Sequence, residues 1–324
     1  MDESDRMEAL GKILIIRGGA IGDFILTMPV LAALRRHFPL APLEVLGYPH
    51  IVQLALATGL ADKVRSIEAR PLAGFFAPHT PLDRELADYF AGFSLIVSYL
   101  FDPDAIFRVN VAKCSSAQFI VGPHRPSETS NAHATEIFLQ PLERLGIFNP
   151  HSVPNLQLNA VQDSTRPRHA LQTCAGPGPR VLALHPGSGS ERKNWPEEKW
   201  AEFISRLAAL PDVHFWLVGG EAEGDRLTRL SAGLPGGRFE VAQNLPLVDL
   251  AFRLRDCHAF VGHDSGISHL AAALGVPTLV LWAHTNPAVW IPRGERVRIV
   301  QNGGRLNELP VKLVMAELER WLAV

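Results

Sequence analysis

Short apolar runs alternate with longer segments of helical periodicity along most of this chain. The run at 12–17 has four consecutive aliphatic residues at its centre, which is typical of a parallel strand covered on both faces. A glycine turn follows, and a helical pattern then extends over 23–37, with Pro29 inside it as an expected kink or break. Further strands are predicted at 43–48, 64–68, 95–100 and 118–121, and a helix at 132–145 closes this half.

A second series of the same kind begins at residue 180. It predicts strands at 180–184, 213–218, 238–241, 258–261 and 278–282. It predicts helices at 197–210, 223–232, 247–257, 266–274 and 310–322. Because such alternation forms parallel sheets, we expect an α/β protein with two doubly wound, Rossmann-like domains. Ligands of these domains bind beyond the carboxyl ends of the strands, which we expect to face each other across a cleft.

The length of 324 residues favours two domains, and a stretch rich in proline and glycine suggests where they join. We predict an N-terminal domain at 1–160, a linker at 161–179 and a C-terminal domain at 180–324, which includes the last helix.

Composition and charge restrict the function classes. A formal net charge of −2 argues against a general attraction to nucleic acid. Three scattered cysteines form no CxxC pair, which argues against a disulfide framework or a zinc knuckle. The polar, acidic N-terminus is unlike a signal peptide, and no apolar run reaches the roughly 18 residues that span a bilayer. We therefore expect a cytoplasmic protein, and a monomer.

The turn after the first strand contains Gly19, Gly22 and Asp23, but no GxGxxG motif. Asp23 stands at the entry of the helix, where a carboxylate would repel a diphosphate. It is either an N-cap, which its position alone favours, or a general base that faces the cleft.

Two segments of the second half are candidate phosphate sites. The loop after the strand at 180–184 contains Ser188, Ser190 and Lys193, whose hydroxyl and ammonium groups suit phosphate oxygens. A polar surface loop before a well-capped helix explains it equally well. The turn Asp264-Ser265-Gly266 starts an alanine-rich helix, where free backbone N–H groups attract anions. Ser265 as a simple N-cap is the alternative there.

Taken together, three stretches resemble glycosyltransferase family 9, the bacterial ADP-heptose:lipopolysaccharide heptosyltransferases. They read "ILIIRGGAIGDFILTMPVLAALRRHFP", "LALHPGSGSERKNWPEEKWAEF" and "GHDSGISHLAAALGVPTLVLWAHTNPAVWIPRG". The resemblance implies a GT-B fold, an N-terminal acceptor domain, a C-terminal nucleotide-sugar domain and inverting transfer. The donor is expected to be ADP-heptose, a substrate rather than a cofactor, and the acceptor a lipid-linked glycan such as the lipopolysaccharide core. Contact with the inner face of the inner membrane would then be peripheral.

The resemblance also assigns roles to residues. Asp23 would be the general base. Ser188, Ser190 and Lys193 would hold the donor diphosphate, and Glu221 the ribose. Asp264, Ser265 and Gly266 would bind the donor sugar and phosphate, with His269 one turn further along the helix. On the acceptor side, Gly19 lies in a turn that is serine-rich in many relatives, and Arg125 lies in the basic segment 122–126.

No metal is expected, because Lys193 and the helix start at Ser265 can stabilise the leaving diphosphate. Asp102-Pro-Asp104 spells DxD, but it follows a strand and is interpreted as a helix cap. His258 and His263 lie at opposite ends of a predicted strand and are interpreted as structural or donor-contacting. Three alternatives stay open: transfer from another nucleotide sugar, a non-catalytic two-lobed binding protein, and a nicotinamide oxidoreductase.

Overall fold

The computed structural model describes residues 11–159 and 180–322. It divides into two compact units, Met1–Val153 and Pro154–Val324. The predicted linker at 161–179 lies outside the described residues, and the predicted domain boundaries stay a prediction.

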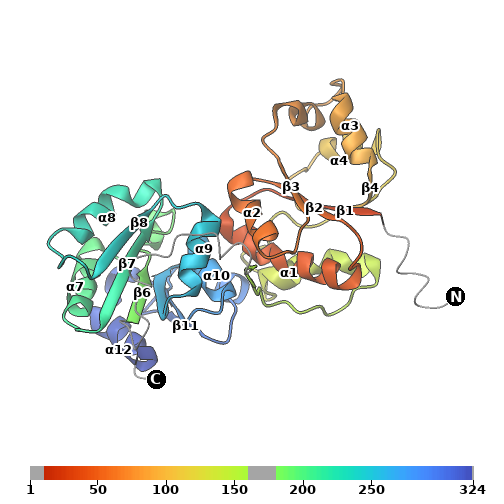
Figure 1. Cartoon of the computed structure of the whole chain (residues 1–324). Coiled ribbons are helices and arrows are strands. Elements are labelled where there is room, and N and C mark those ends of the chain that lie inside the picture. Colours follow the sequence, from red (N-terminus) through yellow and green to blue (C-terminus); the bar gives the residue numbers. More distant parts are fainter. Residues whose placement is uncertain (1–10, 160–179, 323–324) are drawn as a thin grey trace. The chain divides into compact units, whose positions relative to one another are not determined.

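The first unit is a five-stranded sheet in the order β3-β2-β1-β4-β5, in which all neighbouring strands are parallel. Its strands are β1 (Lys12–Arg17), β2 (Leu43–Gly47), β3 (Lys63–Ser66), β4 (Phe93–Ser98) and β5 (Gln118–Val121). Its helices are α1 (Ile21–His37), α2 (Pro49–Ala57), α3 (Arg84–Ala91), α4 (Ile106–Ala112) and α5 (Ala134–Leu139). Two 3-10 helices, Arg70–Phe76 and Gln140–Leu145, complete the unit. Helix α1 lies on one face of the sheet and α3 and α4 on the other, so the apolar centre of β1 is buried from both sides (Figure 1).

Two details of this unit differ from the sequence-based expectation. Of the kink or break expected at Pro29, the break is wrong, because α1 runs from Ile21 to His37, and the kink stays a prediction. Ten of its residues are buried, and this packing compensates for the backbone hydrogen bond that proline cannot donate. The helix predicted at 132–145 is α5 followed by a 3-10 helix, where Pro141 tightens the turn.

The second unit is a six-stranded, fully parallel sheet in the order β11-β10-β9-β6-β7-β8. Its strands are β6 (Arg180–Leu184), β7 (Val213–Gly219), β8 (Phe239–Gln243), β9 (Ala259–His263), β10 (Thr278–Leu281) and β11 (Val297–Val300). Its helices are α7 (Glu197–Ala208), α8 (Gly224–Ser231), α9 (Leu247–Arg255), α10 (Gly266–Ala273), α11 (Pro287–Trp290) and α12 (Val311–Leu322). The sequence analysis did not predict the short elements β11 and α11.

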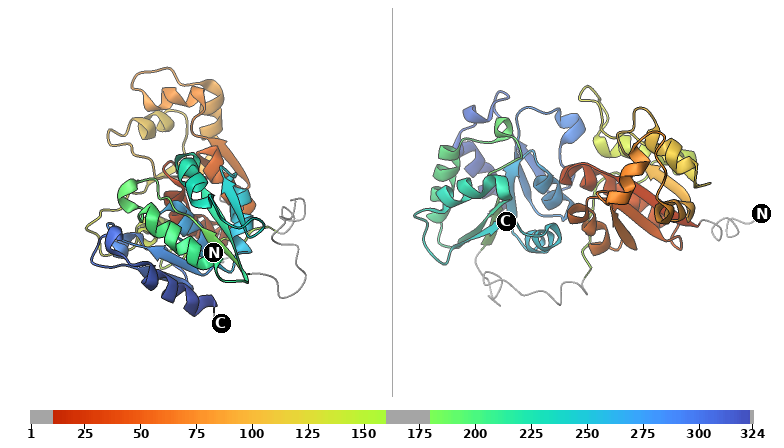
Figure 2. Two further views of the ribbon diagram at one scale, coloured as in Figure 1. Left: turned by 90° about the vertical axis from the view of Figure 1, so that its left-hand side faces the viewer. Right: turned by 90° about the horizontal axis from the view of Figure 1, so that it is seen from above.

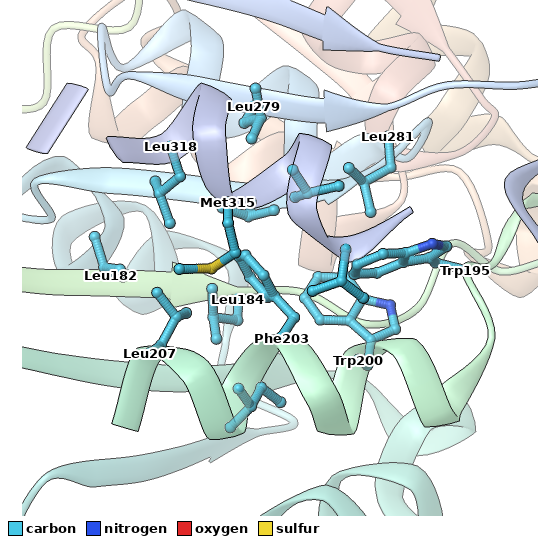
Figure 3. Packing of buried hydrophobic residues seen from close by; sticks show 14 of the residues in the cluster. Leu182, Leu184, Trp195, Trp200, Phe203, Leu207, Leu279, Leu281, Met315 and Leu318 are labelled. Carbon is cyan, nitrogen blue, oxygen red and sulfur yellow. The ribbon is translucent and has the colours of Figure 1, made fainter. Parts of the chain in front are cut away.

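One large apolar cluster holds the helices of this unit to its sheet. Side chains of α7 and α12 converge on the inward residues of β6 and β10, as the close-up in Figure 3 shows. Trp195, Trp200 and Phe203 pack edge to face, with ring centroids 5.5 to 6.0 Å apart. Helices α7 and α12 are neighbours on this face (Figure 2). The start of α7 is thereby fixed, together with the end of the loop that joins it to β6.

Each sheet has a point at which the order of the strands reverses. In the first unit this point lies between β1 and β4, and in the second between β6 and β9. Connections from the two strands leave in opposite directions there, which opens a crevice at the carboxyl ends. The glycine turn with Asp23 follows β1, while the two candidate phosphate segments follow β6 and β9. The predicted site residues that follow β1, β6 and β9 therefore lie where parallel α/β sheets bind ligands.

Candidate functional site

Asp23 is not the N-cap of α1, so that interpretation was wrong. The N-cap is Ala20, and Asp23 is the third residue of the helix. Its Oδ2 accepts a hydrogen bond from the Ala20 backbone N–H at 3.0 Å, and its side chain is 30% exposed. The helix starts early because Gly19 adopts φ +103°, a region that favours glycine. A Cβ at Gly19 would also lie only 2.7 Å from Asp23 Oδ2. Gly19 is thus required by the turn, while its contact with an acceptor stays a prediction.

A buried arginine that the sequence analysis did not single out supports Asp23. Arg17 ends β1, and its side chain is 2% exposed. Its Nη2 lies 3.7 Å from Asp23 Oδ1, and its Nη1 donates to the His124 carbonyl oxygen at 2.8 Å. The guanidinium also lies over the Phe138 ring, 4.6 Å from its centroid. Burial lowers the pKa of Arg17, and the Asp23 carboxylate opposes that effect. A charged residue at the end of an otherwise apolar strand is the signal that could have revealed it.

Arg125 lies in an exposed loop after β5. It pairs with Glu128 at 2.9 Å and directly follows His124, whose carbonyl oxygen Arg17 holds. Its side chain is 62% exposed, so a ligand can reach it.

In the second unit, the structure brings Lys193 and Asp264 into direct contact. Lys193 Nζ donates to Asp264 Oδ2 at 2.6 Å, and the Thr285 hydroxyl donates to the same oxygen at 2.6 Å. The two candidate phosphate segments therefore meet at one place, as parts of one site. The role of Thr285 was not predicted. It comes from the loop after β10, the strand that neighbours β9.

The two serines of the first candidate phosphate segment differ in their hydrogen bonds and exposure. Ser188 Oγ lies 2.7 Å from Asn194 Oδ1 and 2.9 Å from the Ser190 carbonyl oxygen, so its proton is used inside the loop. Ser190 is exposed and precedes the 3-10 turn Glu191–Lys193.

The second segment is an N-cap, as the simpler alternative predicted. Ser265 Oγ accepts the Ser268 backbone N–H at 3.4 Å, and Gly266 is the first residue of α10. Ser265 Oγ also lies 3.5 Å from Nδ1 of the buried His185. His269 is buried on the same helix. Capping uses one backbone N–H group, so it leaves anion binding by the helix start possible.

Two glutamates after β7 have different environments. Glu221, the predicted ribose ligand, is exposed. Glu223 is buried and accepts the Gly220 backbone N–H at 2.9 Å. A Cβ on Gly187 would lie 2.3 Å from Glu223, so the phosphate loop rests directly on that carboxylate. The sequence analysis missed Glu223, because its spacing gives no sign that it turns inward.

His263 links three parts of this site. Its Nε2 accepts the Trp195 backbone N–H at 2.8 Å and lies 3.3 Å from the indole Nε1 of Trp200. Its Nδ1 lies 3.1 Å from the Gly187 carbonyl oxygen, so we infer the neutral tautomer that donates from Nδ1. Burial lowers the pKa of His263 to about 3. Of the two roles left open for His263, the structural one is confirmed.

The other candidate metal ligands also have structural partners. His258 accepts the Val181 backbone N–H at 3.1 Å. Asp102 accepts the backbone N–H groups of Phe107 and Arg108 at the start of α4. It therefore serves the start of that helix, as expected, but from outside the N-cap position, which is Ala105. Within residues 11–159 and 180–322, no three His, Cys, Asp or Glu side chains are grouped to hold a metal ion.

The buried histidines predict how stability depends on pH. Burial lowers the pKa of His185 to about 4, against the opposing charge of Glu223, and that of His263 to about 3. Below pH ~6.5 the unfolded chain binds protons at these residues while the folded protein does not. We expect the free energy of unfolding to fall between pH 6.5 and 5, by up to about 1.4 kcal/mol per pH unit for each histidine. Urea denaturation across this range measures the slope. His263→Gln should have a shallower slope, and an equal slope in both proteins would contradict the prediction.

Comparison with known proteins identifies the family of this chain. The family model "Glycosyltransferase family 9 (heptosyltransferase)" matches residues 134–314, more than half of the chain. Lipopolysaccharide heptosyltransferase 1 of Pseudomonas aeruginosa is 39% identical over 117 residues, which are 35% of this chain and 31% of that protein. The aligned region thus spans about a third of the length of this curated relative.

Solved structures agree at the level of the fold. Escherichia coli heptosyltransferase WaaC with ADP superposes with a TM-score of 0.75 at 18% identity, covering 96% of this chain and 99% of that one. The same enzyme with ADP-2-deoxy-2-fluoro heptose gives 0.69 at 19% identity, covering 95% and 99%. At such low identities the superpositions support the fold alone. They confirm the expected GT-B fold of two parallel α/β domains. Because the family model matches more than half of the chain, the chain belongs to glycosyltransferase family 9, the heptosyltransferase family.

Proposed function

We propose that this protein is an inverting, metal-independent glycosyltransferase that moves heptose from ADP-heptose to a lipopolysaccharide-core acceptor. The observation that carries the proposal is the meeting of Lys193, Asp264 and the start of α10 at the strand-order reversal of the second unit. A cation and free helix N–H groups at such a point suit a diphosphate. Further support comes from the similar proteins, which include a lipopolysaccharide heptosyltransferase and structures with ADP or ADP-2-deoxy-2-fluoro heptose.

In this proposal Asp23 takes the proton of the acceptor hydroxyl. The oxygen then attacks the anomeric carbon, the bond from that carbon to the diphosphate oxygen breaks, and configuration inverts. Asp23 suits this role because its Oδ1 faces Arg17 while its side chain stays partly exposed to a substrate. Its cap bond to Ala20 fixes the carboxylate, so little reorientation is needed at the moment of transfer.

Lys193 stabilises the charge that develops on the leaving diphosphate. Because Asp264 already holds its ammonium group, the cation is positioned before the donor arrives. Asp264 Oδ2 accepts from Lys193 and Thr285, which leaves Oδ1 for hydroxyls of the donor sugar. Ser188, Ser190, Ser265 and Gly266 would complete the diphosphate site, and Glu221 is exposed and suited to paired ribose hydroxyls.

The acceptor and the location of the protein belong to the same proposal. A lipid-linked acceptor places the enzyme at the cytoplasmic side of a membrane, in peripheral contact. None of the helices within the described residues combines the length and apolarity that crossing a bilayer takes.

Removing the base should abolish transfer without weakening donor binding. We expect Asp23→Asn, which can still cap Ala20, to lower kcat by about 10²- to 10⁴-fold. Asp62→Asn is the matched control, because Asp62 likewise accepts one backbone N–H and pairs with one arginine of the same unit. Heptose transfer and ADP-heptose affinity are measured for both variants. An unchanged kcat in Asp23→Asn would contradict the role of Asp23 as general base.

Removing the cation should weaken the diphosphate site. We expect Lys193→Met to raise the Kd of ADP-heptose by about 10- to 100-fold, the range for a charge-assisted hydrogen bond. Lys199→Met is the control, since Lys199 bonds the carbonyl oxygens of Asn307 and Leu309 in the same unit. Isothermal calorimetry gives both constants. Equal donor affinity in the two variants would argue against a phosphate contact by Lys193.

The donor itself can be identified by thermal shift. A ligand that binds only the folded state raises the melting temperature, so ADP-heptose should do so more than UDP- or GDP-sugars at equal concentration. A larger shift with another nucleotide sugar would redirect the proposal to that donor. A shift without transfer to any acceptor would favour a binding protein instead.

A further inference from the structure

An exposed aromatic pair lies beyond the sheet of the first unit, and none of the proposed catalytic steps uses it. Phe101 is 68% exposed. Its ring centroid lies 4.7 Å from that of His124, with the two planes tilted by 60°. Single exposed apolar side chains are ordinary. What distinguishes this one is how its position is fixed and what it is connected to.

Both residues are held in place by the ends of neighbouring strands. Ser98 of β4 is in register with Val121 of β5, so Phe101 and His124 each follow that pair by three residues. Gly122 lies against the Tyr99 ring, where a Cβ would come within 2.4 Å of a ring carbon. On the other side of Phe101, Asp102 is fixed because it caps α4. The backbone that carries the pair is therefore constrained on both strands.

The same backbone is joined to Asp23 by one buried guanidinium. Arg17 Nη1 donates to the carbonyl oxygens of His124, at 2.8 Å, and Tyr99, at 3.4 Å. Its Nη2 lies 3.7 Å from Asp23 Oδ1. One buried side chain thus connects Asp23 with the two segments that carry the aromatic pair, at the carboxyl ends of β1, β4 and β5.

The chemistry of this surface suits a sugar ring. The face of an aromatic ring is electron-rich, and it attracts the polarised C–H groups on one face of a pyranose while packing against its carbons. The His124 ring contacts the Phe101 ring, and Arg125, the next residue along the chain, is 62% exposed. Imidazole nitrogens and a guanidinium can hydrogen-bond the hydroxyl or carboxylate groups of a sugar. A membrane-inserting surface is instead a contiguous apolar face flanked by basic residues. Here Asp102 directly follows Phe101, and Glu128 pairs with Arg125.

We propose that Phe101 and His124 form a platform that binds a sugar ring of the acceptor glycan and thereby presents the attacking hydroxyl to Asp23. This inference rests on the proposed function, since it takes the first unit as the acceptor side. It adds a binding role for two residues that touch the acceptor and do not take part in proton transfer.

Steady-state kinetics of Phe101→Ala tests the platform. The probe is a lipopolysaccharide oligosaccharide from a heptose-deficient strain, with its fatty acids removed. We expect the KM for this oligosaccharide to rise about tenfold, which corresponds to about 1.4 kcal/mol. The KM for ADP-heptose should stay unchanged, because the donor binds the other unit. Phe101→Trp should restore the acceptor KM, whereas Phe101→Leu should not, since leucine keeps apolar area but lacks an aromatic face.

Phe148→Ala is the matched control. Phe148 is 65% exposed and lies in the same unit, away from β4 and β5 in the sequence. Truncating either exposed ring should leave the melting temperature nearly unchanged, so altered kinetics report binding rather than folding. An acceptor KM in Phe101→Ala that equals that of Phe148→Ala would overturn the platform.

Two further outcomes distinguish sugar binding by Phe101 from lipid binding, and failure of the platform from failure of the proposed function. If Phe101→Ala impairs transfer only to the intact lipid-bearing acceptor in vesicles, the residue contacts lipid and the sugar platform is wrong. Calorimetric binding of the delipidated oligosaccharide without donor tests the platform independently of turnover. Loss of that binding in Phe101→Ala supports the platform even if ADP-heptose proves to be the wrong donor. Unchanged binding refutes the platform even if heptose is transferred.

Discussion

At the point where a parallel sheet reverses its strand order, two neighbouring strands end in loops that leave in opposite directions. The backbone groups at this edge have no further strand to pair with, yet several are buried and must be satisfied. Each unit of this protein meets the constraint with one buried polar side chain. Arg17 bonds carbonyl oxygens beyond β4 and β5, and His263 bonds both a carbonyl and an N–H group of the loop after β6. Arg17 thereby lies 3.7 Å from Asp23 Oδ1, and His263 holds both ends of the loop that carries Lys193.

Arg17 and His263 differ in charge, and this difference suits the ligand that we propose for each unit. Arg17 carries a positive charge, which is compatible with an ionised carboxylate at Asp23. His263 is neutral, and both of its nitrogens are occupied by protein groups. The second unit places the ion pair of Lys193 and Asp264 near the carboxyl ends of its strands, where we propose that a diphosphate and a sugar bind. Protonation of His263 at Nε2 would remove its bond to Trp195, and burial, which disfavours the charged form, lowers its pKa in the folded state.

Apolar patterning predicted most of the architecture because strands covered on both faces leave a continuous aliphatic run. The centres of β1 and β6 are such runs, and both strands were predicted at their observed bounds. Short elements with mixed patterns, such as β11, were not predicted, because four residues give no resolvable period. The absence of a break at Pro29 was not predicted either, since the packing that holds α1 together is not visible in its local sequence.

The candidate site residues likewise form two groups, those that the sequence indicated and those that it did not. Residues with exposed chemical groups on recognisable turns, such as Asp23 and Lys193, could be identified from the sequence and from family resemblance. Glu223 and Thr285 could not, because they reach the site from other elements and only the fold brings them together. Arg17 was not identified either, although its charge at the end of an apolar run was a signal. His263 was noticed, yet its role depends on a tautomer that its neighbours determine.

The difference in burial between the two candidate sites affects how the specificity of such a protein can change. The candidate site of the second unit is built on buried, mutually dependent groups, in which replacing His263 or Glu223 would leave a backbone partner unsatisfied and cost stability. The first unit instead places exposed side chains, Phe101 and Arg125, on a backbone that Arg17 and Gly122 already fix. Substitutions at these exposed positions alter the surface of the first unit at little cost in stability. If the second unit binds the donor and the first the acceptor, as we propose, such substitutions would change the acceptor while the donor site stays intact.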